Sequence, residues 1–264
     1  MNVYIMTDIE GISGVYTKAQ VSAAEAKYAE GRAYMTREVN ICASACKAAG
    51  VDKVYVHDCH GSGSNLYWDR LSNDIDGVYI GGAPDNRFHE VVKECDGVIL
   101  LGYHAMAGTR GAVLEHTFNS LSIQNIWIND VAVGEIAIDA GILGDMGIPV
   151  IMVSGDDKAC LEAKSFLPNV VTAEVKRGSV CMGALLLPPE KAEAIIRASV
   201  AEAIANIKNA KPLVFEKPIR MKFERTERTP LPKPCTKPFM EILDGRSYVI
   251  TGDDVESTFF RGNS

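Results

Sequence analysis

Histidines and carboxylates cluster just after short apolar runs in the first part of the sequence. Asp8 and Glu10 follow the first run two positions apart, so in extended backbone both side chains point to the same side. His60 and His104 follow two later runs, and imidazole nitrogen is a donor that borderline-soft ions such as zinc accept. Glu135 stands near the start of an expected helix, whose first turn favours an anion. This mixed donor set suits a hydrolytic metal site, and one bridging carboxylate would suit two ions roughly 3.5–4 Å apart.

Each of these residues also has an ordinary structural interpretation. Asp8 could cap a turn, Glu10 could be solvated surface, and His104 could be a hydrogen-bonded core histidine. His60 stands beside a Gly-Ser loop, and such loops also bind phosphate, but the glycine-rich phosphate motifs are absent. Residue type and position alone therefore leave both a metal site and these structural roles open. Cys59 could also be a ligand, although core packing accounts for it better.

A serine nucleophile is not supported by the sequence. The stretch Gly11-Ile-Ser13-Gly14 does not match the Gly-x-Ser-x-Gly pattern of a nucleophile elbow, and no other stretch supplies one. Asp156 and Asp157 follow Gly155 directly and are better explained as a helix cap than as part of a site.

Short β-branched runs alternate along the chain with helical patterns, and these elements would position the candidate residues. The alternation predicts βαβ units and a mostly parallel sheet flanked by helices. The expected fold is therefore a Rossmann-like three-layer α/β core. In such sheets the ligand site lies outside the carboxyl ends of the strands, so polar residues there converge although they are distant in sequence. The expected strands are 3–6, 53–56, 98–101 and 149–153, the expected helices are 36–50, 88–94 and 133–146, and 116–129 is expected to form a strand pair.

The pattern changes after residue 178. A long amphipathic helix is expected over 189–207, followed by strands within 213–225 and 246–251. A proline-rich segment, 229–238, separates these strands and must be irregular. We therefore expect a catalytic α/β domain over 1–178 and a smaller α+β domain over 179–264.

Composition narrows the classes of function. The 264 residues carry 27 basic and 34 acidic side chains, a net charge of −7, which argues against nucleic-acid binding. No apolar stretch approaches the ~20 residues that span a bilayer, so no membrane association is expected. The N-terminus lacks the features of a signal peptide, and the seven cysteines form an odd set without a Cys-x-x-Cys pair. We expect reduced thiols and a cytoplasmic location.

Several short motifs lie around these candidate residues. The most specific are Asp8-Ile-Glu10-Gly-Ile-Ser-Gly14 and Leu101-Gly-Tyr-His104-Ala. They are accompanied by Asp58-Cys-His60, Ile128-Asn-Asp130 with Val133-Gly-Glu135, and Ser154-Gly-Asp-Asp157. Together these motifs closely resemble the zinc D-aminopeptidases of the DppA type, and weaker similarity continues through Ala173-Glu-Val-Lys176.

The resemblance implies a specific site and assembly. It implies two zinc ions per subunit, with Asp8 as the bridge, and a homo-oligomer that is a decameric ring in the family's known form. His116 would be the catalytic histidine, although this chain's loop between His104 and His116 is slightly longer than the family pattern. The implied metal ligands are Asp8, Glu10, His60, His104 and Glu135.

The expected activity is hydrolysis of short peptides with an N-terminal D-residue, such as D-Ala-D-Ala, by metal-activated water. Two alternatives stay open at this point. The metals could serve an amidohydrolase that acts on another small amide, which a substrate panel would detect. The chain could also be a non-catalytic dipeptide-binding accessory protein of a transport system, although five potential ligands exceed what mere binding needs.

Overall fold

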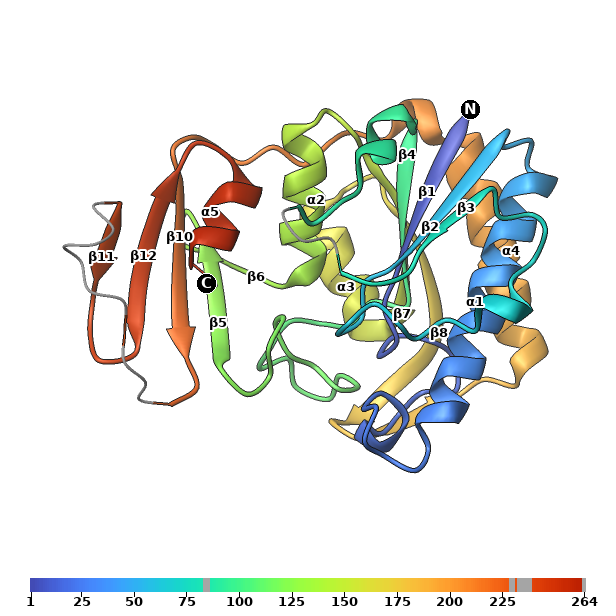
Figure 1. Cartoon of the computed structure of the whole chain (residues 1–264), viewed down its shortest axis with the longest axis horizontal. Coiled ribbons are helices and arrows are strands. Elements are labelled where there is room, and N and C mark those ends of the chain that lie inside the picture. The colour runs from blue at the N-terminus through green and yellow to red at the C-terminus, as the bar shows by residue number, and fades with distance from the viewer. Residues whose placement is uncertain (83–85, 228–230, 232–238, 263–264) are drawn as a thin grey trace.

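The computed structural model describes residues 1–82, 86–227, 231 and 239–262. The elements form two sheets joined by a buried helix (Figure 1). The first sheet has seven strands in the order β3-β2-β1-β4-β7-β8-β9, parallel except for the antiparallel pair β8 and β9. Its strands are β1 (Asn2–Thr7), β2 (Lys53–Asp58), β3 (Gly77–Tyr79), β4 (Gly97–Leu101), β7 (Val150–Asp156), β8 (Val171–Val180) and β9 (Gly183–Leu186).

Helices cover both faces of this sheet. On one face lie α1 (Tyr28–Ala48) and α4 (Pro189–Ala205), which pack on each other. On the other face lie α2 (Glu135–Asp145) and α3 (Asp157–Phe166). The central strand β1 alternates between the two cores, and its apolar residues are fully buried because neither face meets water. The expected three-layer α/β core is confirmed.

The second sheet is antiparallel, in the order β11-β12-β10-β5-β6. Its strands are β5 (Ile123–Ile128), β6 (Val131–Val133), β10 (Ile219–Arg225), β11 (Met240–Ile242) and β12 (Ser247–Gly252), and α5 (Val255–Gly262) packs on β10 and β12. Asn129 and Asp130 join β5 to β6 with positive φ angles of 49° and 65°, the backbone that a two-residue hairpin turn requires.

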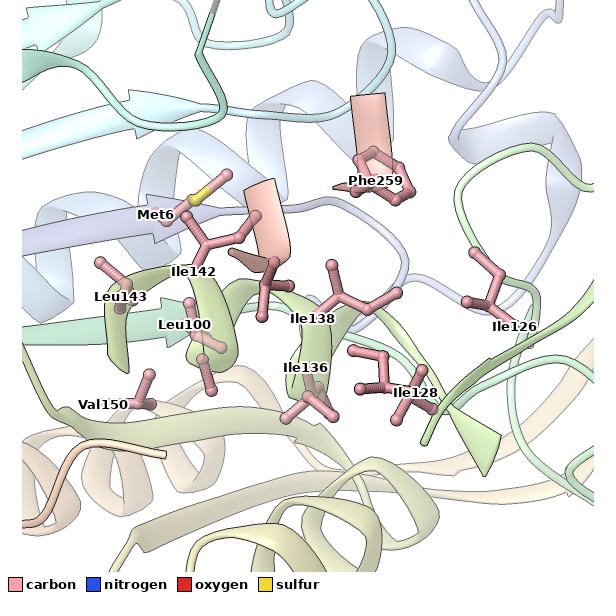
Figure 2. Close-up of a cluster of buried hydrophobic side chains, with 14 of the residues drawn as sticks. Met6, Leu100, Ile126, Ile128, Ile136, Ile138, Ile142, Leu143, Val150 and Phe259 are labelled. Atoms are coloured by element: carbon pink, nitrogen blue, oxygen red, sulfur yellow. The ribbon is translucent and has the colours of Figure 1, made fainter. Parts of the chain in front are cut away.

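Helix α2 is buried along its whole length between the two sheets. Figure 2 shows its isoleucines between Met6 and Leu100 of the first sheet and Ile126 and Ile128 of the second. A helix whose side chains are mostly apolar all around needs such an enclosed place, and its one charged residue in the middle, Asp139, is paired with Arg87. Because α2 begins at Glu135, this burial fixes the helix end that faces the predicted site.

Several predicted elements differ from the observed ones. The helix expected over 36–50 begins at Tyr28, and the one expected over 88–94 is a short 3-10 helix, Glu90–Glu94. Of the strand pair expected over 116–129, only β5 forms there, and its partners β6 and β10 lie later in the chain. Most of the proline-rich segment 229–238 lies outside the described residues.

The division expected at residue 178 does not coincide with the two sheets. Strands β5 and β6 precede residue 178 but belong to the second sheet, whereas β9 and α4 follow it and pack with the first. No helix in the described part of the chain has the length and apolar character needed to cross a membrane.

Candidate metal centre and active site

The five predicted metal ligands meet at the carboxyl ends of β1, β2 and β4. Asp8 and Glu10 lie on the loop after β1, His60 follows β2, and His104 follows β4. Glu135 reaches the same place from the first turn of α2. Because β1 pairs with both β2 and β4, the loops that leave these strands are neighbours in space.

Asp8 stands at the centre of this group. Its Oδ1 atom lies 3.0 Å from His60 Nδ1, and its Oδ2 atom lies 3.4 Å from His104 Nε2. Glu10 Oε2 is 3.1 Å from the same His60 nitrogen, and Glu135 Oε1 is 3.2 Å from His104 Nε2. The two oxygens of the Asp8 carboxylate therefore contact two different imidazoles. Each imidazole also has a second carboxylate beside it, Glu10 for His60 and Glu135 for His104.

The donor atoms fit a metal centre better than a closed hydrogen-bond network. Glu10 Oε2 and His104 Nε2 are buried and have no hydrogen-bond partner among the described residues, although carboxylate or imidazole atoms lie close by. Buried polar groups without a partner are costly, and a bound cation would satisfy them. Asp8, Glu10 and His104 form one group whose potential ligand atoms all lie within 4.8 Å of one another; His104, His116 and Glu135 form a second.

The electrostatics of the site depend on burial and on these close partners. Burial alone would lower the pKa values of His60 and His104, but the neighbouring carboxylates raise both, that of His104 to about 10. Burial alone would raise the pKa values of Asp8 and Glu135, but the imidazoles hold both below their usual range, that of Glu135 at about 2. Asp8 and Glu135 are thus held in their ionised form, which attracts positive charge.

Two glycines let the loops after β1 and β4 touch. The Gly11 amide donates a hydrogen bond to the Gly102 carbonyl oxygen over 2.7 Å. A Cβ atom at Gly11 would lie 2.0 Å from the Tyr103 carbonyl oxygen, and one at Gly102, whose φ is +70°, would lie 2.5 Å from the Asp8 carbonyl oxygen. The glycine of the Asp-x-Glu-Gly motif is therefore needed to bring Asp8 next to His104.

A buried lysine holds the other side of the Glu10 loop. Lys176 on β8 donates from Nζ to the carbonyl oxygens of Glu10, Ile12 and Val15, over 2.5, 2.9 and 2.6 Å. Burial lowers the pKa of Lys176 to about 8. All three donors of the ammonium group are used, so Lys176 fixes the backbone that presents Glu10.

The His60 loop is fixed by Asp58, the last residue of β2. The Asp58 carboxylate accepts hydrogen bonds from the backbone amides of Asn65 and Leu66 and from the Asn65 side chain, at 2.5 to 2.9 Å. Asn65 in turn donates to the His60 carbonyl oxygen over 2.7 Å. These bonds close the loop and aim the His60 ring at Asp8.

His116 lies against the metal-ligand group on a strained loop. Its ring stacks on that of His104 with centroids 4.0 Å apart, and its Nε2 atom is 3.7 Å from Glu135 Oε1. Its Nδ1 atom lies 2.9 Å from the Leu114 carbonyl oxygen; a proton on Nδ1 donated there would leave Nε2 free as an acceptor. Leu114 and Phe118, on either side, have φ angles of 55° and 58°, a costly conformation for such residues.

Two buried carboxylates behind this loop hold it in place. Asp156 accepts from the Val113 amide over 2.7 Å, while its other oxygen caps α3, as the sequence predicted. Glu162 accepts from the Met106 amide over 2.7 Å, and burial raises the pKa of Glu162 to about 7. These bonds fix the loop at Met106 and Val113, and the Phe118 amide donates to Glu135 Oε1 over 2.8 Å, which fixes its other end.

A cavity of about 660 Å³ opens over these residues. Asp8, Glu10, His60, His116 and Glu135 line its inner wall, and His104 lies beneath them, 2% exposed. The outer wall includes Phe118 and Leu121, and Cys181 and Met182 of the turn between β8 and β9. A space of this size accommodates a short peptide but not a folded protein.

Sequence reasoning missed three charged residues near the site: Glu162 and Lys176, which are buried, and Arg87, which is half-buried. Lys176 lay within a stretch that resembled the family, but nothing marked the lysine itself as buried. Arg87 and Glu162 carry no local signal, because their partners lie 52 and 56 residues away. Only the folded chain brings these groups to the site.

Imidazoles and carboxylates grouped at the carboxyl edge of a parallel sheet, beside a peptide-sized cavity, define a metal-dependent hydrolase of the α/β class. Comparison with known proteins identifies the family. Residues 1–261 match the peptidase M55 family, described as D-aminopeptidase, and the chain belongs to that family.

Two relatives support this assignment. A D-aminopeptidase of Bacillus subtilis (strain 168) is 34% identical over 213 residues, covering 81% of this chain and 77% of that protein. The solved structure of the Zn-dependent D-aminopeptidase DppA from Bacillus subtilis, described as a self-compartmentalizing protease, is similar with a TM-score of 0.91 and 29% identity, covering 100% and 97% of the two chains. These matches confirm the family and fold predicted from the sequence, and they favour a metal-dependent peptidase over a non-catalytic binding protein.

Proposed function

We propose that this chain removes the N-terminal D-residue from short peptides such as D-Ala-D-Ala with two zinc ions per subunit. The proposed ligands are Asp8, Glu10, His60, His104 and Glu135, with Asp8 between the two ions. The observation that carries the proposal is the position of Asp8, whose two carboxylate oxygens face His60 and His104 separately. The relative DppA is itself described as Zn-dependent.

Bound zinc would supply Lewis acidity and lower the pKa of water from 15.7 toward ~7, which makes a nucleophile available at neutral pH. The protein supplies the ligand geometry and the proton transfer. The two glycine contacts and Lys176 hold the carboxylates of the β1 loop in place before substrate arrives. The cavity then restricts access to short peptides.

His116 is proposed to transfer a proton during hydrolysis through its Nε2 atom. Its stacking on His104 and its contact with the Leu114 carbonyl oxygen fix the ring, and its side chain is 18% exposed on the cavity side. A positioned acid or base of this kind contributes ~10²–10⁴-fold to a rate. His116 is also close enough to His104 and Glu135 to act as a ligand, so the zinc content of a His116 variant separates the two roles.

Paired substrates test the proposed function. The zinc-loaded protein is given D-alanyl and L-alanyl amides, with and without a chelator, and ammonia release is measured. Release from the D-amide alone, abolished by the chelator and restored by zinc, is expected. Activity that survives complete removal of metal would refute the metal mechanism, and equal release from both amides would refute the preference for D-residues.

The proposal extends to the assembly and the location of the protein. The self-compartmentalizing character of DppA supports a homo-oligomer, and we propose a decameric ring. Ten chains of 28.6 kDa give 286 kDa, which light scattering on the eluting protein would measure. A cytoplasmic location is proposed because the six described cysteines are all free thiols.

A further inference from the structure

Arg87 places a fixed guanidinium group in the wall of the cavity. Its Nε and Nη2 atoms donate to the two carboxylate oxygens of Asp139 over 2.8 and 2.9 Å. Asp139 is fully buried on α2 and also accepts from the Tyr103 hydroxyl over 2.7 Å. The Phe118 ring centroid lies 5.1 Å from the guanidinium carbon. The Arg87 side chain is therefore held rigidly on two sides.

One nitrogen of this guanidinium, Nη1, is not used by Asp139. The pair with Asp139 uses Nε and Nη2, and Nη1 makes no hydrogen bond within the described part of the chain. The side chain is 15% exposed, and Arg87 is one of the residues that line the cavity. Its Nη1 donors are thus available to a ligand without disturbing the bond to Asp139.

Arg87 also lies at a suitable distance from the proposed metal centre. Its Nη2 atom forms an ion pair with Glu135 Oε2 over 3.8 Å. This separation from a proposed metal ligand is about the length of one peptide unit, which spans about 3.8 Å between Cα atoms. In a dipeptide the terminal carboxylate is one residue beyond the bond to be cut. A substrate whose scissile carbonyl lies at the metal ligands can therefore bring that carboxylate to Arg87.

The other lysine or arginine in the described lining of this cavity is Lys18, whose side chain is exposed. A flexible lysine in water loses more freedom on binding than a preorganised arginine, and guanidinium matches the planar geometry of carboxylate. The fixed cation of the cavity is therefore suited to an anionic end of the substrate rather than to a neutral side chain.

We propose that Arg87 is a specificity-determining residue that binds the carboxylate of the leaving residue. This inference rests on the proposed function. The favoured substrates are then dipeptides, in which that residue ends in a free carboxylate. Longer peptides and amides present a neutral carbonyl oxygen at the same place and bind more weakly.

The test compares D-Ala-D-Ala with its C-terminal amide, which differs in charge at one group only. The wild-type zinc enzyme is expected to have a kcat/KM at least roughly 10-fold higher for the free acid, because a hydrogen bond to a charged group is worth a factor of about 10–100. In Arg87→Gln the ratio of the two kcat/KM values is expected to fall to near 1, mainly through a higher KM for the free acid, while any effect of the lost contact with Glu135 lowers both substrates alike. Arg197→Gln, which removes an arginine paired with Glu193 on α4, is the matched control and should keep the wild-type contrast.

A purely structural role for Arg87 would affect both substrates equally. Should Arg87→Gln fail to fold because Asp139 is left unpaired, the double variant Arg87→Gln with Asp139→Asn removes both charges and is expected to show the same loss of contrast. Equal kcat/KM values of the wild type for the two substrates, or equal losses in the variant, would overturn the assignment while leaving the peptidase intact. Absence of hydrolysis of both substrates by the zinc-loaded wild type would overturn the proposed function and this assignment with it.

Discussion

Replacing Lys176 with methionine tests whether a buried ammonium group holds the Glu10 loop. Methionine keeps much of the volume but leaves the carbonyl oxygens of Glu10, Ile12 and Val15 without their donor. Each hydrogen bond to a charged donor contributes about 1.5–3 kcal/mol. Against this, the fall of the Lys176 pKa to about 8 indicates that burial of the charge costs about 3 kcal/mol. The three bonds together contribute about 4.5–9 kcal/mol, so the expected net loss is roughly 1.5–6 kcal/mol.

The assay is urea unfolding of the metal-free protein, combined with zinc affinity from competition with a chelator. Lys176→Met should lower the free energy of unfolding by the amount above and weaken zinc binding at least about 10-fold, because the backbone that presents Glu10 is no longer fixed. Lys53→Met, at an exposed strand lysine, is the control and should change the stability by less than about 0.5 kcal/mol. A loss below about 1 kcal/mol in Lys176→Met, with unchanged zinc affinity, would refute the reasoning.

Three further predictions concern the metal ligand Asp8, the proposed proton-transferring residue His116 and the buried His57. Asp8→Ala should lose zinc as well as activity, and full zinc occupancy measured by atomic absorption would exclude its bridging role. His116→Ala should keep both zinc ions and lose turnover by about 10²–10⁴-fold; an unchanged kcat would remove His116 from the mechanism. Burial lowers the pKa of His57 to about 3, so the unfolded chain binds a proton below about pH 6.5 that the folded chain does not accept until about pH 3. Stability should therefore fall by up to about 2 kcal/mol between pH 6.5 and 5 in the metal-free protein, and His57→Phe, measured by the same urea unfolding, should show a shallower fall; an identical slope would contradict this.

The first sheet could be predicted because its signal is local. The strands β1, β2, β4 and β7 are buried on both faces, so each is a short run of β-branched and apolar residues. The early start of α1 was missed because Glu30, Gly31 and Arg32 interrupt the apolar pattern. Gly31 lies where it does because a Cβ atom there would be 1.9 Å from the Gln20 carbonyl oxygen, a contact that no pattern in the sequence reveals.

The second sheet could not be assembled from the sequence because its pairing is non-local. Strand β10 pairs with β5, and Met221 lies opposite Ile128 across more than ninety residues of chain. The residues before β5, which were expected to be a strand, form the loop of His116 instead, and bonds to Asp156 and Glu162 hold it. Local alternation of apolar residues does not distinguish a strand from such a loop.

The metal centre was predictable to the extent that strand ends meet at one edge. Asp8, His60 and His104 all follow strands of one parallel sheet, so their convergence follows from topology. Arg87 and Lys176 were not predictable, because a charged residue is usually exposed and only tertiary contacts show that Lys176 is buried and Arg87 half-buried.

The most direct test of the central claim is anomalous X-ray diffraction at the zinc edge from crystals of the zinc-loaded protein. The account predicts two peaks in each subunit. One peak lies beside Asp8 and Glu10, next to His60 or His104. The other lies beside His104 and Glu135, and Asp8 contacts both. Absence of zinc from this group, or its appearance only at other residues, would contradict the account.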